Sequence, residues 1–582
     1  WKVLPITKNK DKIASIRALL KEATAVVHAG DADREGQRVV DEVLQQLGWK
    51  KPVTRVLLKA LNAPEIAKAM AAAKDNREFR GMCEASRARD RADGLVGWHF
   101  SRLVSIKAQE GGYKDVVSIG RIQTPVLGFI VARELEIRNF KPVDYYEPYA
   151  VIRVKGGSFR AKWAPRPDQA GLDDEGRLLD QRIAQGLQQR VHGRAALIAQ
   201  YKDEQKQQLA PLPFSMASLQ VYAYRKLGFD NDKVLKTTQS LYDKKHVTYP
   251  RVDTQYLPTS QHADAATILP AALRAIGIDP GMAAKASPSR KSKAFNDSKA
   301  TAHHAIVPTD AAPGPGDLTD DERRLYDIIA RRYIAQFMPP RTYRSVQVVA
   351  EVSGEAFKAA GATTIDPGWK ALYGDTAAPQ EADEATDEQD SAEDGVSLPP
   401  MTKGEAGACD GLEIQKKKTT PPPPYDPASL TLAMLEVHKL VTDPKVKAIF
   451  EKIRAEAETP EQGGLGTPAT RHTFVDKLID KDLVKKISKG RAKKGSDEKC
   501  YYQPTQAGID LYEALMASAP ALIKPDMTAL WEMTFDQIEA GQVTVDQFID
   551  VMKRWITDNF NAINRSGVSL TASERRSFAK AR

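Results

Sequence analysis

Hydrophobic and polar positions divide the first part of the chain into a strand-like and a helix-like stretch. Residues 24–28 are apolar and β-branched and stop at Gly30, and residues 35–47 then place apolar side chains at helical spacing. This pattern predicts one strand, a loop and a helix of an α/β domain. From 64 to about 138, Ala, Leu, Met and Arg recur at spacings of three and four, so we expect a helical lobe to follow.

Strand-like alternation of apolar and polar residues occurs in two separate places. It covers residues 145–165 and returns near 343–358. We interpret the two places as parts of one β-domain that the chain leaves and re-enters. The residues between them, 201–340, have a largely helical pattern and are predicted to form an insert.

The carboxyl third is predicted to be helical with one interruption. It follows the prolines at 421–424 and spans 426–582. Its interruption resembles a winged-helix pattern, with a helix at 469–480, strands at 482–487 and 499–503 around a basic turn at 488–495, and a helix at 505–516.

Length and composition exclude a single small module and a membrane-spanning chain. The 582 residues are several times the usual domain of about 150 residues, so several cores are expected. Hydrophobic residues make up 42% of the chain, and no apolar run approaches the roughly 18 residues that a span requires. We therefore expect no contact with the interior of a membrane.

The cysteines favour a reducing compartment. Cys83, Cys409 and Cys500 lie far apart, and none has a second cysteine two to four positions away. This spacing is that of neither a disulfide framework nor a zinc ribbon. A reducing compartment fits a cytoplasmic protein. The chain begins at Trp1 without Met and without a charged-then-apolar leader, so we see no targeting signal and expect upstream residues to be missing.

The charge balance predicts a polyanionic partner. Lys and Arg number 85 against 76 Asp and Glu, a net charge of +9. Residues 381–394 hold eight of the acids and no base, which leaves +17 for the rest of the chain. Nucleic acid is the first candidate partner and a membrane surface the second. The acidic stretch 376–396 has almost no apolar residues to bury and is predicted to be a disordered loop.

Three carboxylates follow the first predicted strand. Asp31, Asp33 and Glu35 would lie at the carboxyl edge of a sheet, where α/β folds bind ligands. Their mutual repulsion raises their pKa values unless a cation intervenes, which makes Mg²⁺ a natural partner for oxygen ligands. An acid-capped, solvated helix start is the alternative interpretation.

A tyrosine in an extended segment is the candidate nucleophile. The proline after Tyr249 favours an extended backbone, in which Tyr249 and Arg251 point the same way. A phenol attacks phosphorus only if a nearby cation stabilises the phenolate, and a guanidinium is suited to this task. Most tyrosines are core or surface residues, so this alternative stays open.

Weaker signals come from four further segments. Arg89 and Asp93 are four apart on a predicted helix and could form an intrahelical ion pair. The segment at the next helix start has donors for a phosphate, or is a plain helix cap. It consists of Ser118, Ile119, Gly120, Arg121, Ile122, Gln123, Thr124 and Pro125.

Two later segments are equally open to more than one interpretation. His303 could donate to a phosphodiester, although a His pair such as His303 and His304 is usually structural. Thr470 and Arg471 belong to another helix start with hydrogen-bond donors. No G-x-x-x-x-G-K-[ST] motif occurs, which argues against the use of ATP.

Together and in this order, these segments resemble the type IA DNA topoisomerases, and most of all the bacterial topoisomerase III branch. The resemblance runs through nearly the whole chain. It is carried by the acidic Toprim motif (Asp31, Asp33, Glu35), Arg89 with Asp93, Ser118 to Pro125, Tyr249 with Arg251, His303 of a His-x-Ala-Ile motif, Gly466 to Arg471, and Trp531 with Glu532.

The family fold that this resemblance implies is a multidomain α/β plus α toroid with four lobes. On this chain it implies a Toprim domain at 1–63, a helical lobe at 64–140 whose second, winged-helix-like part is 426–582, a β-rich arch at 141–200 and 346–425 with the acidic loop 376–396, and a helical tyrosine domain at 201–345.

The activity that the resemblance implies is ATP-independent cleavage and religation of single-stranded DNA through a transient 5′-phosphotyrosine. Strand passage through the break would relax negative supercoils or decatenate DNA. The implied partners are single-stranded, negatively supercoiled or catenated DNA, bound by a nucleoid-associated monomer with Mg²⁺ as cofactor.

The resemblance also implies roles for individual residues. Tyr249, Arg251, Glu35 and His303 would be catalytic, and Asp31, Asp33 and Glu35 would hold the metal. The implied DNA-binding residues are Arg89, Asp93, Ser118, Ile119, Gly120, Arg121, Ile122, Gln123, Thr470 and Arg471.

One departure from the family pattern lies at the start of the chain. Family members open with a strand that carries a glutamate and a lysine, and no such segment precedes Trp1. We expect a chain without that glutamate to bind DNA and to cleave it poorly. A single-strand-binding form without chemistry is therefore the first rival, and another Toprim enzyme, such as a primase or nuclease, is the second.

Overall fold

The computed structural model describes most of the chain. The described residues are 9–58, 63–300, 303–374, 393–394, 396–441, 443–456, 459, 461, 463–467, 470–490 and 496–571. The predicted acidic loop, apart from 393–394 and 396, and residues 491–495 of the predicted basic turn lie outside the described residues.

A small α/β unit forms the amino-terminal part. Its three-stranded sheet has the order β1-β2-β3, with β1 parallel to β2. The predicted strand, loop and helix are confirmed, because β1 ends just before the acidic residues and α2 begins just after Asp33. The elements are α1 (Lys10–Glu22), β1 (Val26–His28), α2 (Arg34–Gln46), β2 (Val53–Arg55), α3 (Ala63–Ala71) and β3 (Lys74–Asp75).

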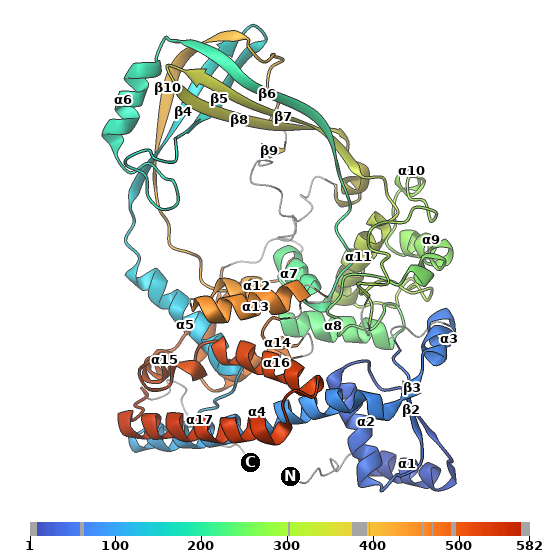
Figure 1. The fold of residues 1–582 in the computed structure, drawn as a ribbon. Coiled ribbons are helices and arrows are strands. Elements are labelled where there is room, and N and C mark those ends of the chain that lie inside the picture. Colours follow the sequence, from blue (N-terminus) through green and yellow to red (C-terminus); the bar gives the residue numbers. More distant parts are fainter. Residues whose placement is uncertain are drawn as a thin grey trace.

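The helical lobe is built from two distant parts of the chain. Its elements are α4 (Arg80–Glu110), α5 (Gln123–Asn139), α12 (Pro427–Leu435), α13 (Pro444–Glu456), α14 (Arg471–Asp480), β11 (Val484–Ser488), β12 (Cys500–Pro504), α15 (Gln506–Ser518), α16 (Asp526–Glu539) and α17 (Val545–Ser566). One core cluster joins both parts through residues such as Phe100, Leu127 and Phe535. In Figure 1, α17 lies along α4 at the base of the molecule.

The β-rich segments close into a small barrel. Its strands follow the order β5-β4-β10-β6-β7-β8, and β5 also pairs with β8. The elements are β4 (Asp144–Val154), β5 (Gly157–Ala164), α6 (Gln181–Val191), β6 (Ala195–Gln208), β7 (Arg341–Val352), β8 (Glu355–Asp366), β9 (Glu393–Asp394) and β10 (Ala406–Lys418). The barrel core contains alternate residues of its strands, such as Ala150, Ile152 and Val154 of β4.

Three predicted boundaries were wrong. The amino-terminal unit was expected to end at 63, yet β3 still pairs with β2, so the helical pattern just after 63 belongs to α3 of that unit. The second part of the arch was expected from 346, yet β7 begins at Arg341. The helical insert was expected from 201, yet β6 continues to Gln208 and pairs there with Arg341 of β7. The outer half of β6 is almost entirely polar, so its sequence has no strand-like alternation. Backbone pairing with β7 forms this strand in the absence of an apolar face.

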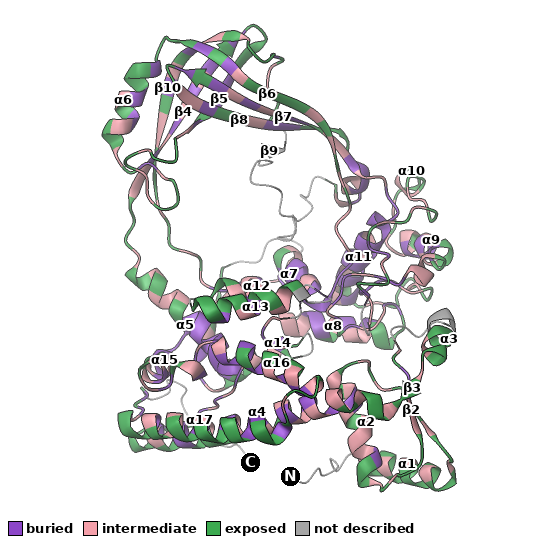
Figure 2. Cartoon of the chain, in the orientation of Figure 1, coloured by how far each residue is buried: buried purple, intermediate pink, exposed green. Residues whose placement is uncertain are grey.

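The insert between β6 and β7 is helical and has its own core. Its helices are α7 (Met216–Leu227), α8 (Asn231–Asp243), α9 (Ala265–Ala275), α10 (Pro280–Ala283) and α11 (Asp320–Ala335). Phe214, Phe229 and Phe337 are fully buried within it. In Figure 2, buried residues concentrate in α7, α8 and α11, and exposed residues cover the outer faces of α1 and α17.

The lobes are arranged as a ring in the ribbon view. The barrel is joined on one side to the helical lobe through α5 and α12, and on the other to the insert through β6 and β7 (Figure 1). The insert then meets the amino-terminal unit and the helical lobe at the base. No helix of the described part of the chain is long and apolar enough to cross a membrane. Cys83, Cys409 and Cys500 are free and buried.

Candidate active site

A buried arginine positions the acidic loop that follows β1. The Arg55 guanidinium on β2 donates to the carbonyl oxygens of Asp31 at 2.6 Å and Gly30 at 2.7 Å, and to Gln37 Oε1 at 2.7 Å. A Cβ atom on Gly36 would lie 2.4 Å from the Asp31 carbonyl oxygen, so only glycine allows the loop to fold onto the start of α2. Sequence reasoning missed Arg55, and its only signal was a lone arginine in an apolar strand.

The acidic residues of the loop are in different states. Asp33 caps α2 by accepting a hydrogen bond from the Gly36 amide at 2.6 Å. Its side chain reaches solvent, yet surrounding protein removes part of its water, and this desolvation raises its pKa. Glu35 and Asp31 raise it further, while the Gly36 amide and His303 oppose the rise. The negative charge around Asp33 is therefore not fully compensated by nearby cations or hydrogen-bond donors.

Glu35 is already paired with a cation. Its carboxylate accepts a hydrogen bond from Arg89 at 2.6 Å. Within the described ranges, no group of three or more His, Cys, Asp or Glu residues is arranged to hold a metal ion. Asp31 and Asp33 still fit Mg²⁺, because this ion is usually held by one or two carboxylates together with water and substrate phosphate. The predicted third ligand, Glu35, is not available in this conformation.

The candidate nucleophile lies among aromatic rings. The Tyr249 ring centroid is 4.8 Å from that of His303 and 5.6 Å from that of Tyr242. The Thr248 amide donates to the Val307 carbonyl at 3.0 Å, which holds the tyrosine segment beside the histidine segment. The structure thus brings together Tyr249 and His303, the two residues for which the family resemblance implied catalytic roles.

The tyrosine also lies close to the acidic loop. Burial raises the pKa of the Tyr249 phenol, Arg251 lowers it, and the charges of Asp31 and Asp33 raise it again. The net shift is upward, so a bound cation beside the acids would ease ionisation of the phenol. The acids of the amino-terminal unit are thus near enough to affect the tyrosine electrostatically, although they are distant in sequence.

The two neighbouring histidines have different surroundings. His304 lies within hydrogen-bond distance of Gln261 Nε2, at 2.9 Å, and of the Ala305 carbonyl, at 3.1 Å. Burial lowers the pKa of His304 to about 4, so it is neutral at physiological pH. The structural interpretation therefore applies to His304, and His303 is the member of the pair that faces Tyr249.

Arg89 and Asp93 do not pair with each other. Arg89 contacts Glu35 and, at 3.3 Å, Glu532, whereas Asp93 accepts from Arg121 Nε at 2.9 Å. The intrahelical ion pair suggested by their spacing is thus replaced by contacts with other segments. Both residues of α4 orient groups from distant parts of the chain.

Glu532 is the centre of an arginine cluster. It lies 3.1 Å from Arg121, 3.3 Å from Arg89 and 3.9 Å from Arg34. Burial raises its pKa, but the three guanidinium groups outweigh this and lower it. Arg34 also contacts Glu539 of α16 at 2.5 Å, so the cluster ties the start of α2 to α16. The sequence marked Glu532 only through the resemblance and did not predict this network.

The predicted phosphate-binding segment is mostly satisfied by the protein itself. The amides of Ile119 and Gly120 donate to the hydroxyls of Ser101 and Thr124, each at 2.9 Å. Gln123 differs, because its Nε2 is buried and has no hydrogen-bond partner among the residues that the structure describes. An unpaired buried donor is costly, which makes Gln123 the member of this segment that is best prepared for a ligand.

The last predicted contact, at the start of α14, is internal. Arg471 is only 2% exposed and forms an ion pair with buried Glu461 at 2.5 Å. The hydroxyls of Thr470 and Thr467 lie 2.9 Å apart. Arg471 therefore does not reach the surface in this conformation, and Thr470 is the more accessible of the two.

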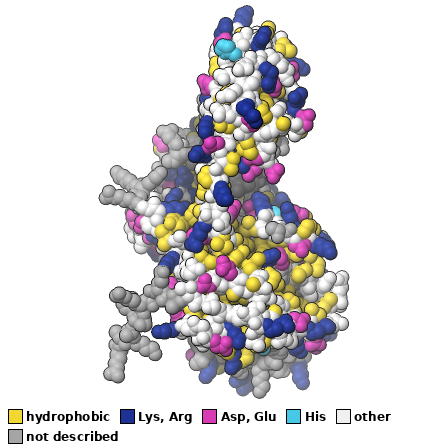
Figure 3. Space-filling view, turned by 90° about the vertical axis from the view of Figure 1, so that its left-hand side faces the viewer, with side chains coloured by type: hydrophobic (Ala, Val, Ile, Leu, Met, Phe, Trp, Pro, Cys, Tyr) yellow, Lys and Arg dark blue, Asp and Glu magenta, His cyan; other side chains and the backbone are white. Residues whose placement is uncertain are grey.

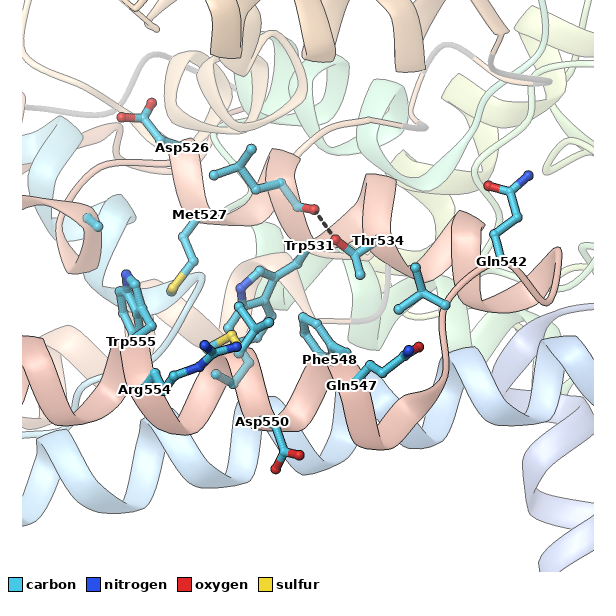
Figure 4. Close-up of a pocket in the computed structure, with 15 residues that line it drawn as sticks. Asp526, Met527, Trp531, Thr534, Gln542, Gln547, Phe548, Asp550, Arg554 and Trp555 are labelled. Atoms are coloured by element: carbon cyan, nitrogen blue, oxygen red, sulfur yellow. Dashed lines mark hydrogen bonds between the residues drawn. The ribbon is translucent and has the colours of Figure 1, made fainter.

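A separate pocket lies between α16 and α17 (Figure 4). Its volume is about 770 Å³, and its walls include Trp531, Phe548, Met552 and Trp555. Apolar walls of this kind suit neither a phosphodiester nor a metal, so the pocket is not part of the candidate active site.

The surface of the barrel carries both signs of charge. Figure 3 shows acidic and basic side chains intermixed over the barrel, which argues against a uniform basic face on that side.

Comparison with known proteins identifies the class of this chain. A model of the DNA topoisomerase family matches residues 77–550. The chain belongs to the type IA DNA topoisomerases, isomerases that cleave and religate one strand of DNA. The resemblance drawn from the sequence motifs is thereby confirmed.

The relatives narrow the class further. The chain is 35% identical to DNA topoisomerase 3 of Vibrio cholerae, over 93% of this chain and 80% of that protein. It is 33% identical to DNA topoisomerase 3 of Haemophilus influenzae, over 99% and 86%. The solved structure of full-length topoisomerase I from Thermotoga maritima aligns with a TM-score of 0.61 and 21% identity, covering 96% of this chain and 81% of that one, and shows the shared fold.

Proposed function

We propose that Tyr249 attacks a phosphodiester of single-stranded DNA, becomes linked to the 5′ phosphate and frees a 3′ hydroxyl. The observation that carries this proposal is the meeting of Tyr249 with His303 and with the charges of Asp31 and Asp33. The ester keeps the energy of the broken bond, so the 3′ hydroxyl can reverse the reaction without ATP.

Arg251 and His303 handle the charge of the reacting phosphate. Arg251 lowers the pKa of the Tyr249 phenol, and the same cation would stabilise negative charge on the phosphate oxygens. The His303 ring, packed against Tyr249, can donate a hydrogen bond to the phosphate. Glu35 is held by Arg89, so its part in proton transfer requires release of that ion pair.

The type IA topoisomerases are typically metal-dependent, and Asp31 and Asp33 are the residues that would hold Mg²⁺ here. When bound, the ion supplies positive charge beside the phosphate. Arg55 fixes the carbonyl of Asp31, and the cap at Gly36 fixes the carboxylate of Asp33, so the protein presents both acids in a defined geometry.

Single-stranded DNA would reach the tyrosine along the helical lobe. Gln123 provides an unpaired donor, and Thr470 a hydroxyl, while Arg89, Asp93, Arg121 and Arg471 orient the surrounding segments. The ring then opens, passes another strand and closes, as a monomer, relaxing negative supercoils or unlinking catenanes. Backbone contacts of this kind weaken steeply with salt.

A covalent-adduct assay tests the proposal. A labelled oligonucleotide is incubated with the protein and Mg²⁺. The protein is then denatured and examined for covalently linked label. Tyr249→Phe should abolish the linked label, whereas Tyr242→Phe, which alters the neighbouring ring, should retain it. Label that persists in Tyr249→Phe would exclude this nucleophile. Binding without any adduct in the unaltered protein would favour the single-strand-binding alternative.

A further inference from the structure

The chain path shows where the ring can part. Residues 209–340 are joined to the rest of the chain only through β6 and β7 of the barrel. Their contacts with the helical lobe are therefore non-covalent and can open without breaking the backbone. If the proposed function is correct, the contacts at this interface set the free energy that is needed to open the ring for strand passage.

The hairpin of β11 and β12 makes several of these contacts. The Asp497 amide donates to the carbonyl of Leu227, the last residue of α7, at 2.6 Å. Its carboxylate lies 2.8 Å from Lys233 Nζ of α8 and 3.2 Å from Arg324 of α11. One residue of the hairpin thus engages three helices of the insert.

The insert is shaped to receive this hairpin. Gly228 follows α7 with a φ of +74°, and a Cβ atom there would lie 2.4 Å from the Asp497 carbonyl oxygen. A larger residue would be excluded twice, by its backbone conformation and by the approaching chain. The end of α7 and the hairpin are therefore matched surfaces.

Further contacts extend the interface on both sides of Asp497. Lys486 of β11 lies 2.6 Å from Asp230, and the Cys500 amide donates to the Tyr224 hydroxyl at 3.0 Å. A small apolar cluster fills the centre and contains Val221, Tyr224, Ala428, Cys500 and Leu432. This cluster combines α7 of the insert with α12 and β12 of the helical lobe.

The electrostatics of the hairpin contact are attractive. Burial raises the pKa of Asp497, but Lys233 and Arg324 outweigh it and lower the pKa. Burial likewise raises the pKa of Asp230, and Lys486 reverses this to a net lowering. Both carboxylates are charged at neutral pH and stabilise the closed interface in that form.

We infer that the β11–β12 hairpin is the clasp of the ring, and that Asp497 is a positioning residue whose release from Lys233 and Arg324 accompanies opening. This inference rests on the proposed function. In a winged helix that binds DNA, a hairpin of this kind would face nucleic acid. Here Lys486, Asp497 and Cys500 contact the insert, so the hairpin would act on the opening of the ring and not as a DNA reader.

Amide hydrogen exchange tests the clasp without requiring activity. The amides of Asp497 and Cys500 are hydrogen-bonded across the interface, so their exchange reports its opening. Asp497→Asn keeps the shape and removes the charge. We expect exchange in residues 496–500 to rise about threefold to tenfold, with less dependence on salt than in the unaltered protein.

A matched control uses an ion pair outside the clasp. Asp410 pairs with Arg153 on the barrel at 2.8 Å, so Asp410→Asn removes a comparable charge and should leave residues 496–500 unchanged. Tyr224→Phe is a second clasp variant, because it removes the hydroxyl and keeps the ring in the apolar cluster. It should raise exchange in the same residues. Unchanged exchange in both clasp variants would overturn the inference.

Activity separates a clasp from general destabilisation. With a short oligonucleotide, Asp497→Asn should form the Tyr249-linked adduct to within about twofold of the unaltered protein, because cleavage does not require opening. Its relaxation of supercoiled DNA should accelerate by a similar threefold to tenfold factor, and most at low salt. Equal loss of adduct and relaxation would overturn the clasp, whereas absence of adduct in the unaltered protein would overturn the proposed function alone.

Discussion

Two of the places where the insert lies close to the rest of the ring differ in their charge balance. At the acidic loop, desolvation raises the pKa of Asp33, and the charges of Glu35 and Asp31 raise it further. At the clasp, Asp497 has a lowered pKa because two cations surround it. Excess negative charge is what the proposed Mg²⁺ site requires, whereas balanced charge suits a contact between two parts of the protein.

The largest expected effect comes from removing the unbalanced charge. Replacing Asp31 and Asp33 together with Asn should reduce adduct formation with labelled oligonucleotide by at least about a hundredfold, since the carboxylates that would hold Mg²⁺ beside the reacting phosphate are lost. Asn retains helix-capping ability, so α2 should persist. Circular dichroism checks folding, and Asp410→Asn, which should keep full activity, is the control.

The next largest effect concerns the arginine cluster beside the site. Glu532→Gln leaves Arg34, Arg89 and Arg121 without their shared carboxylate. Because the side chain is one-quarter exposed, we expect a loss of about 2 kcal/mol, below the value for a fully buried pair. Thermal or urea unfolding of the whole chain measures this loss of stability. An unchanged unfolding midpoint would contradict the central role of Glu532.

The two interfaces should respond oppositely to the same chemical change. Without Mg²⁺, Asp33→Asn removes a repulsion and should raise the unfolding temperature slightly. Asp497→Asn removes an attraction and should lower the unfolding temperature, with a loss in the free energy of unfolding of less than about 1 kcal/mol because the site is partly exposed. Calorimetry in chelator compares the two variants, and shifts of the same sign would refute the contrast.

The smallest expected effect is a pH dependence from His304. Its folded pKa of about 4 lies below the usual value of 6.5, so the unfolded chain binds more protons between these values. Stability should therefore fall as the pH drops from 6.5 toward 4 and should stay constant above 6.5. His304→Gln should flatten this part of the profile, measured as unfolding midpoint against pH.

The sequence analysis succeeded where one segment carries its own pattern. The strand and helix around the acidic loop, and the helix, hairpin and helix at 471–518, lie close to the predicted bounds. The outer half of β6 and all of β10 escaped, because their polar residues form strands only when neighbouring strands supply hydrogen bonds. Local patterning predicts elements that bury a face of their own, and misses those completed by others.

By itself, the sequence determined the family, the acidic motif, the tyrosine with its arginine, and the order of most elements, because these depend on residues that are neighbours along the chain. Only the tertiary structure decided that Arg89 and Asp93 turn to different partners, that Arg55 supports the acidic loop, and that Asp497 joins Lys233 and Arg324. Ion pairs between distant segments leave no periodic trace in a sequence, since their geometry exists only after the chain has folded.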